Sequence, residues 1–155
     1  MDCLFCKIIA GEIPSHKIYE DEHTLAFLDI NQDVWGHSLV VPKRHFENTF
    51  DMPEAEIKHI VRTTKKIATH LKNNVGVDGI NLLNNSGEHA GQIVHHFHLH
   101  IFPRFKGDGF KEDGAEGIKK DKTLAALGAH LTELKMNSVP IVRDIVEIRE
   151  KLSIR

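Results

Sequence analysis

Five short stretches of the chain carry the apolar or alternating pattern of β-strands. They cover residues 16–20, 24–29, 37–42, 79–84 and 94–102. The first two lie on either side of Asp21 and Glu22, a pattern typical of a hairpin. Pro42 and Pro103 end the third and fifth stretches, and residues 85–91 (NSGEHAG) are rich in loop formers.

One long amphipathic helix is predicted from Pro53 to Lys72. Its apolar residues recur at intervals of three and four, which puts them on one face. Together with Thr64, they are Ile57, Ile60, Val61, Ile67, Ala68 and Leu71. Pro53 suits the first turn, Asp51 is expected to cap it, and Gly76 lies where the helix should end.

Shorter helices are predicted for residues 4–9, 122–132 and 140–152. Residues 106–117 hold four glycines in a charged context and are expected to form a flexible loop. The pattern therefore predicts an α+β domain with an antiparallel sheet of about five strands, one long helix and a C-terminal helical tail. We assign residues 1–110 to the domain and residues 111–155 to a loop and tail packed on it.

Length, charge and the apolar runs exclude several classes of protein. A chain of 155 residues fits one domain. The net charge of -2 predicts no binding to nucleic acid and no attraction to an anionic membrane. The apolar runs are far shorter than the ~20 residues of a membrane span. The first residues do not read as a signal peptide, so we expect a cytoplasmic protein.

The two cysteines, Cys3 and Cys6, form a C-x-x-C pair. Two are too few for a disulfide framework. A thioredoxin-like pair is expected within a βαβ pattern, whereas this pair precedes every predicted strand. Zinc needs about four ligands, and the chain has 12 histidines to supply the rest. A zinc site is therefore favoured, with a redox pair or free thiols as the alternative.

Histidine recurs at every second position of the last predicted strand. His96, His98 and His100 alternate with Phe97, Leu99 and Ile101. Because side chains on a strand alternate between faces, the three imidazoles share one face and the apolar residues pack on the core. We expect the histidine face to line a cleft, bind a metal or contact polar partners, because three alternating imidazoles are a poor choice for a face that is merely exposed to solvent.

The run HFHLHIF, residues 96–102, resembles the signature of the histidine triad (HIT) family. The segments CKIIAGEIP, YEDEHTLAFLDI, GHSLVVPKRH and NNSGEHAGQIVHHFHLHIFPR are similar to family segments with their spacing kept. The resemblance covers about residues 3–110 and is to the bacterial Hint-like branch. It implies a HIT-like fold for residues 1–110 and a homodimer with the helix and a strand at the interface.

The resemblance implies that His98 is a nucleophile. It would attack the α-phosphorus of a purine nucleotide conjugate, and water would then release a nucleoside monophosphate from the nucleotidyl-histidine. A neutral imidazole suits this role because its ordinary pKa is about 6.5. The ring's other nitrogen needs an acceptor, by resemblance a backbone carbonyl. His100, His37 and His96 complete the implied catalytic set, with His100 and His37 at the phosphate.

The resemblance also implies a substrate-binding set. Gly91 and Gln92 match the loop that approaches the phosphate, and Asn85 matches a residue that binds phosphate or ribose oxygens. Asp29 matches the carboxylate that accepts ribose hydroxyls, with Ile30 and Phe27 near the base.

A structural zinc site is implied as well. Its ligands would be Cys3, Cys6, His45 and His96, and together they would make a closed tetrahedral site. Such a site pins the N-terminus to the sheet. The reaction then needs no catalytic metal, because His98 itself is the nucleophile.

The implied activity is cleavage of a nucleoside phosphoramidate, such as an adenosine 5'-monophosphoramidate. The alternatives are hydrolysis of dinucleoside polyphosphates, a weakly catalytic purine nucleotide-binding or partner-binding protein, and a metal-binding protein. Ile93 departs from the family, where several members carry a serine or another polar residue near the leaving group. The isoleucine removes a hydrogen-bond donor, so the leaving-group preference stays open.

Overall fold

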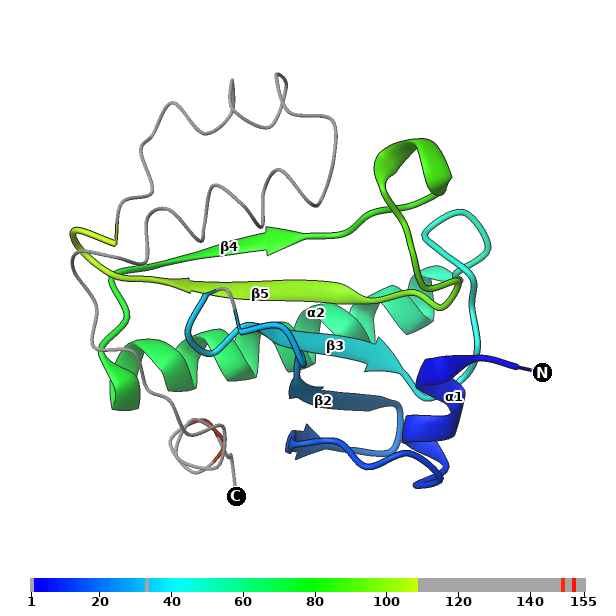
Figure 1. Ribbon diagram of the computed structural model, residues 1–155, viewed down its shortest axis with the longest axis horizontal. Helices are drawn as coiled ribbons and strands as arrows, with labels where there is room; N and C mark the ends of the chain where they lie inside the picture. Colours follow the sequence, from blue (N-terminus) through cyan, green and yellow to red (C-terminus); the bar gives the residue numbers. More distant parts are fainter. Residues whose placement is uncertain (1, 33, 109–148, 150–151, 153–155) are drawn as a thin grey trace.

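A five-stranded antiparallel sheet organises the chain in the computed structural model, which describes residues 2–32, 34–108, 149 and 152 (Figure 1). The strands are β1 (Lys17–Glu20), β2 (Thr24–Leu28), β3 (Ser38–Pro42), β4 (Gly79–Leu83) and β5 (Leu99–Arg104). Their order is β1-β2-β3-β5-β4, and every neighbouring pair is antiparallel. The predicted α+β class and the antiparallel sheet are confirmed.

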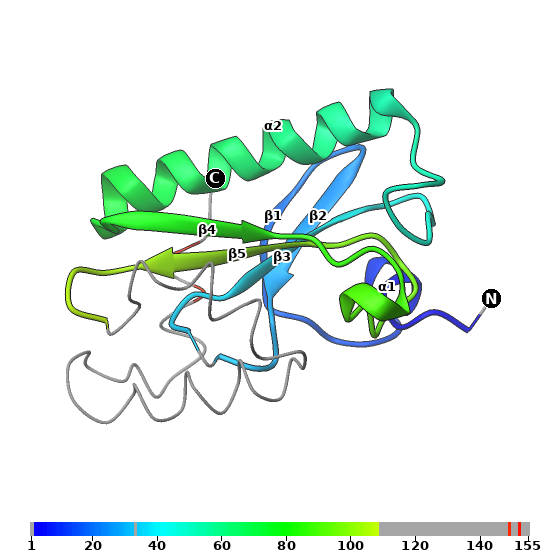
Figure 2. The ribbon, with the colours of Figure 1, turned by 90° about the horizontal axis from the view of Figure 1, so that it is seen from above.

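The long helix α2 (Glu54–His70) covers one face of the sheet (Figure 2). A π-helical turn, Leu71–Val75, extends it, and Gly76 ends it in the left-handed conformation at φ 81°. The predicted apolar face is the one turned to the sheet, except at Val61, which is 58% exposed. Helix residues such as Ile60 and Ile67 pack against Ala26, Val40 and Ile101 of the sheet.

The predicted cap of this helix is wrong. Pro53 occupies the N-cap position, and no side chain caps the helix. The carboxylate of Asp51 instead accepts hydrogen bonds from the backbone N–H groups of Glu47 and Asn48 at 2.9 and 3.0 Å. Asp51 therefore stabilises the loop before the helix.

The short helix α1 (Leu4–Ile9) lies on the opposite face of the sheet from α2 (Figure 2). A second apolar cluster forms beneath it, from Cys3, Phe5, Ile8, Leu25, Phe27, Leu39 and Val41. Because both faces are covered, every residue of β2 and β3 is buried. Alternate residues of each strand serve the two clusters.

The strand that carries the histidines is shorter than predicted. Residues 94–102 were expected to form it, but β5 begins only at Leu99. The Phe97 N–H donates to the Phe46 carbonyl at 2.7 Å instead of to a neighbouring strand. In the register of β3 and β5, Phe97 would face Pro42, which has no N–H to donate. His96 and His98 therefore lie on an irregular segment just before β5.

The predicted helix at 122–132 lies outside the described residues, as do most of residues 140–152. Leu152 is described and is 1% exposed within the cluster under α2. No helix in the described part of the chain has the length and apolar character that crossing a membrane requires.

Gly36, the residue before His37, offers a test of this packing. Its φ is +75°, and a Cβ there would lie 3.2 Å from Pro103 Cγ and 3.4 Å from Leu152 Cδ1. Gly11 has φ +78° but nothing within 4 Å. Both alanine variants carry the left-handed strain of roughly 1–2 kcal/mol. We expect Gly36→Ala to lose about 1 kcal/mol more than Gly11→Ala in urea unfolding, because of crowding. Equal losses would mean that Pro103 and Leu152 do not crowd this position.

Candidate functional site

Four metal-binding side chains converge where α1 meets the sheet. Cys3 Sγ lies 3.4 Å from His96 Nδ1, and Cys6 Sγ lies 3.6 Å from the same atom and 3.4 Å from His45 Nδ1. Ideal tetrahedral zinc bonds of 2.3 Å to sulfur and 2.0–2.1 Å to nitrogen give a sulfur–nitrogen separation of about 3.6 Å. The spacing of this cluster therefore fits a single zinc ion.

The protonation of His96 also fits a metal ligand. Its Nε2 lies 2.9 Å from the Pro42 carbonyl oxygen. A carbonyl can only accept, so Nε2 carries the hydrogen and the lone pair of Nδ1 faces the two sulfurs. Burial lowers the pKa of His96 to about 4, which keeps the ring neutral as a ligand must be.

The same reasoning fixes the ring of His98. Its Nδ1 lies 2.7 Å from the carbonyl oxygen of His96, so Nδ1–H donates and Nε2 keeps a lone pair. The Phe5 ring packs edge-on against it, with centroids 5.3 Å apart. Burial lowers the pKa of His98, against the raising effects of the His96 carbonyl and Asp29. A neutral imidazole with one nucleophilic nitrogen results.

A hydrogen-bonded pair of imidazoles stands beside it. His37 Nδ1 lies 3.0 Å from the Asn31 carbonyl, so it donates and His37 Nε2 accepts from His100 Nδ1 at 2.9 Å. Asp29 Oδ2 is 3.7 Å from His37 Nε2. The rings of His98 and His100 are in contact, with centroids 4.9 Å apart. Burial, with smaller contributions from His37 and His98, lowers the pKa of His100 to about 3.

Comparison with known proteins agrees with this geometry. Residues 10–107 match the family model described as "HIT domain". The chain belongs to the HIT family. It is 54% identical over 110 residues to "Protein hit" of Bacillus subtilis, covering 70% of this chain and 76% of that protein.

Two further relatives bear on chemistry and metal. The chain is 41% identical over 107 residues to "Adenylylsulfatase HINT3" of Arabidopsis thaliana, covering 69% of this chain and 54% of that protein. A zinc-bound HIT protein of Mycobacterium smegmatis superimposes with a TM-score of 0.67 at 35% identity, covering 86% of this chain and 96% of that one. This HIT protein is thus a nucleotide-binding protein or nucleotide hydrolase, with a cluster suited to zinc.

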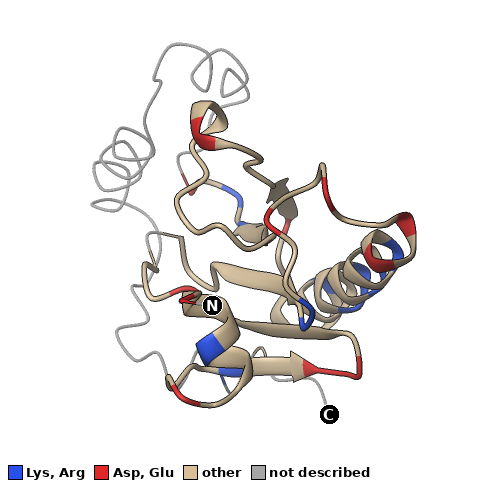
Figure 3. Ribbon diagram, turned by 90° about the vertical axis from the view of Figure 1, so that its right-hand side faces the viewer, with Lys and Arg blue, Asp and Glu red and all other residues tan. Residues whose placement is uncertain are grey.

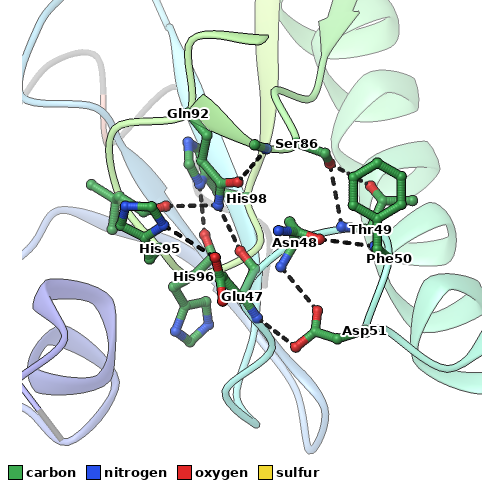
Figure 4. Close-up of polar contacts among 12 residues, drawn as sticks. Glu47, Asn48, Thr49, Phe50, Asp51, Ser86, Gln92, His95, His96 and His98 are labelled. Carbon is green, nitrogen blue, oxygen red and sulfur yellow. Dashed lines mark hydrogen bonds and ion pairs between the residues drawn. The ribbon is translucent and has the colours of Figure 1, made fainter. Parts of the chain in front are cut away.

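The predicted phosphate loop of the HIT protein is held by its own side chains. Asn85 Nδ2 lies 3.5 Å from the Gly91 carbonyl, and Gly91 has φ 83°. Gln92 points toward the backbone of Glu47 (Figure 4) and donates to its carbonyl at 2.6 Å. Its side-chain oxygen accepts from the Gly87 N–H at 2.7 Å. The amide of Gln92 thus joins two loops, a contact that the sequence did not predict.

The predicted nucleoside residues differ in exposure. Asp29 is partly exposed, and its Oδ1 accepts from the Asn31 N–H at 2.8 Å. Phe27 is 3% exposed and packs edge-on against Phe5, whereas Ile30 is 96% exposed. Ile93, the departure from the family, is 70% exposed. The structure brings Asp29 to His37 but buries Phe27 in the cluster beneath α1.

Several contributors have no side-chain signature in the sequence. The acceptors that fix the imidazoles are backbone carbonyls of Asn31, Pro42 and His96. Phe5 contacts the rings of both His96 and His98. The one sequence signal for Phe5 is its position between the two predicted zinc ligands Cys3 and Cys6.

The buried neutral histidines predict acid sensitivity. His100 has a folded pKa near 3 and an ordinary value of 6.5, so its contribution to stability is complete above pH 6.5 and declines as pH falls toward 3. At pH 5 the loss is on the order of 2 kcal/mol. We expect His100→Gln to lose less stability between pH 7 and pH 5 than the unmutated protein in urea titrations. The control is His89→Gln, an exposed site, which should behave as the unmutated protein does; if His100→Gln does so too, this origin of acid sensitivity is wrong.

Proposed function

We propose that this HIT protein is a hydrolase or transferase that attacks the α-phosphate of a purine nucleotide conjugate through a covalent nucleotidyl-histidine on His98. The observation that carries the proposal is the 2.7 Å contact between His98 Nδ1 and the His96 carbonyl. It commits the ring's hydrogen to Nδ1 and leaves Nε2 as the nucleophile. The depressed pKa of His98 keeps that lone pair available at neutral pH.

In the first step, a bond forms between His98 Nε2 and the α-phosphorus while the bond from phosphorus to the leaving group breaks. The His98 ring becomes cationic, and the hydrogen bond from Nδ1 to the carbonyl then strengthens. In the second step, water attacks the same phosphorus, the phosphorus–nitrogen bond to His98 breaks, and a nucleoside monophosphate leaves.

The leaving amine needs a proton, for which we propose His100. When the substrate binds, the pair takes up one proton from solvent, which adds to His100 Nε2 while the proton of the 2.9 Å contact moves from His100 Nδ1 to His37 Nε2. His100 Nε2–H then donates to the leaving amine. The positive charge then lies on His37 beside Asp29, 3.7 Å away. The substrate phosphate adds negative charge that favours this protonated pair. The attacking water returns the proton in the second step.

A nucleoside phosphoramidate is the substrate class we favour. A second candidate is a nucleotide with a phosphorus–oxygen–sulfur link, because the Arabidopsis relative is named an adenylylsulfatase. Dinucleoside polyphosphates are a third. A weakly catalytic nucleotide-binding or partner-binding protein is the non-enzymatic alternative. Asn85 and Gly91 are proposed for the phosphate, Asp29 for the ribose and the exposed Ile30 for the base, whereas Phe27, buried in the cluster beneath α1, is assigned no contact with the nucleotide.

Zinc is proposed to have a structural role. Cys3, Cys6, His45 and His96 would complete a tetrahedral site, leaving no position for substrate. The bound ion would supply a cross-link between α1 and the segment before β5. His96 is then a ligand whose backbone carbonyl orients His98, rather than a residue that contacts the substrate.

A homodimer is proposed as the assembly. β4 is an outer strand of the described sheet, with Asn81 and Leu82 exposed. A second copy pairing there would cover an open edge. The acidic residues of α2, Glu54 and Glu56, lie in its first turn, and the basic residues Lys58, Arg62, Lys65 and Lys66 follow them along the helix (Figure 3).

The nucleophile is tested by His98→Ala. We expect kcat for adenosine 5'-phosphoramidate to fall by at least ~10³-fold, because no other group forms the intermediate. Substrate labelled at the α-phosphorus should leave a labelled adduct in the unmutated protein and none in the variant. The control, His89→Ala, should retain both. Turnover that survives in His98→Ala refutes the assignment, and the three substrate classes are ranked by kcat/KM in the unmutated protein.

The metal is tested by elemental analysis and thermal unfolding. The purified protein should contain about one zinc per chain, and a chelator should lower its Tm. Cys6→Ser should contain less zinc and show a smaller response to the chelator, whereas His89→Asn should match the unmutated protein. A content below about half a zinc ion per chain in the unmutated protein would contradict the proposal.

A further inference from the structure

The backbone of His98 lies beyond the end of the hydrogen-bonded ladder. The last pairs of β5 are Leu99 with Val40 on one side and His100 with Leu83 on the other. The His98 carbonyl instead accepts a hydrogen bond from the side-chain amide of Asn84 at 2.9 Å. Asn84 directly follows β4, so its side chain supplies a bond where regular pairing has stopped.

We propose that Asn84 is a positioning residue for the reaction, which fixes the backbone of His98 and thereby the direction of its nucleophilic nitrogen. This inference rests on the proposed role of His98. Asn84 is assigned no contact with the substrate. It acts through the His98 carbonyl alone.

The orientation of the Asn84 amide is determined by its neighbours. A carbonyl accepts only, so Asn84 Nδ2 faces His98 and Oδ1 faces the opposite way. There Oδ1 lies 2.8 Å from the hydroxyls of both Thr49 and Ser86. Those hydroxyls are 2.8 Å apart, and Ser86 Oγ also accepts from the Thr49 N–H at 3.2 Å. The amide is therefore held from both ends.

The loop that carries Thr49 also contacts the N-terminal end of the histidine segment, residues 95–98 (Figure 4). The Phe46 carbonyl accepts from the Phe97 N–H at 2.7 Å, and the Glu47 carboxylate lies 3.3 Å from His95 Nδ1. Residues 95–98 are thus fixed by the loop, directly at His95 and Phe97 and through Asn84 at His98. This arrangement replaces the missing strand pairing.

The expected consequence falls on kcat. Because Asn84 holds the nucleophile and not the nucleotide, its loss leaves binding intact and lets Nε2 move from its line of attack on phosphorus. A displacement of about 1 Å at a reacting group can cost ~10²-fold in rate. Loosening of the His98 backbone should also alter its Nδ1–H contact with the His96 carbonyl.

Two variants separate the role of the Asn84 side-chain N–H, which donates to the His98 carbonyl, from that of its oxygen, which accepts from Thr49 and Ser86. Asn84→Ala removes both functions, while Asn84→Asp keeps oxygens for Thr49 and Ser86 but removes the N–H that His98 accepts. The matched control is Asn73→Ala, an exposed asparagine that follows α2. Each protein is measured for kcat and KM with adenosine 5'-phosphoramidate. The nitrogen-15 signals of the His98 ring are measured by NMR without nucleotide.

We expect both Asn84 variants to lose about 10- to 100-fold in kcat with KM within about twofold. Their His98 signals should shift toward a mixture of tautomers, while Asn73→Ala matches the unmutated protein in every measurement. Unchanged His98 signals in the folded Asn84 variants overturn the inference, as does a loss confined to KM. Since the NMR signals need no substrate, a His98 shift supports positioning even if His98→Ala shows that the nucleophile is another residue.

Discussion

A single peptide carbonyl, that of His96, links the parts of this site. It accepts the Nδ1–H of His98 at 2.7 Å and so determines which nitrogen of that ring can react. The side chain of the same residue lies between two cysteine sulfurs and donates to Pro42. The orientation of the His98 imidazole therefore depends on α1, on β3 and on the segment before β5. The residue that joins them, His96, is itself 0% exposed.

Burial and hydrogen bonding act in opposite directions on these histidines. Enclosure under Phe5 and within the sheet disfavours a charged ring, which lowers the pKa values of His96, His98 and His100. Backbone carbonyls set the tautomers of His96 and His98, and the His37 ring sets that of His100. The result is a row of neutral imidazoles with defined lone pairs, and the carboxylate of Asp29 lies 3.7 Å from the adjacent His37.

Periodicity made much of the fold predictable, because two clusters on opposite faces impose alternation on β2 and a 3.6-residue repeat on α2. The family resemblance anticipated the gathering of Cys3, Cys6, His45 and His96. The start of β5 was not predictable, because it depends on Phe97 donating to Phe46, a contact between distant segments. Nor were the carbonyl acceptors or the Gln92 contacts, since backbone acceptors occur at every position and carry no residue signature.

The sheet order has a consequence for how the chain reaches its final form. β5 is the last described strand in the sequence, yet it lies between β3 and β4. Cys3 must also meet His96, 93 positions later. During synthesis the N-terminal thiols emerge long before their partners, and no strand-by-strand order of folding can complete the sheet. Because β4 pairs only with β5, the pairing of the described sheet finishes only after the histidine segment has been made, and contacts this distant in sequence form slowly.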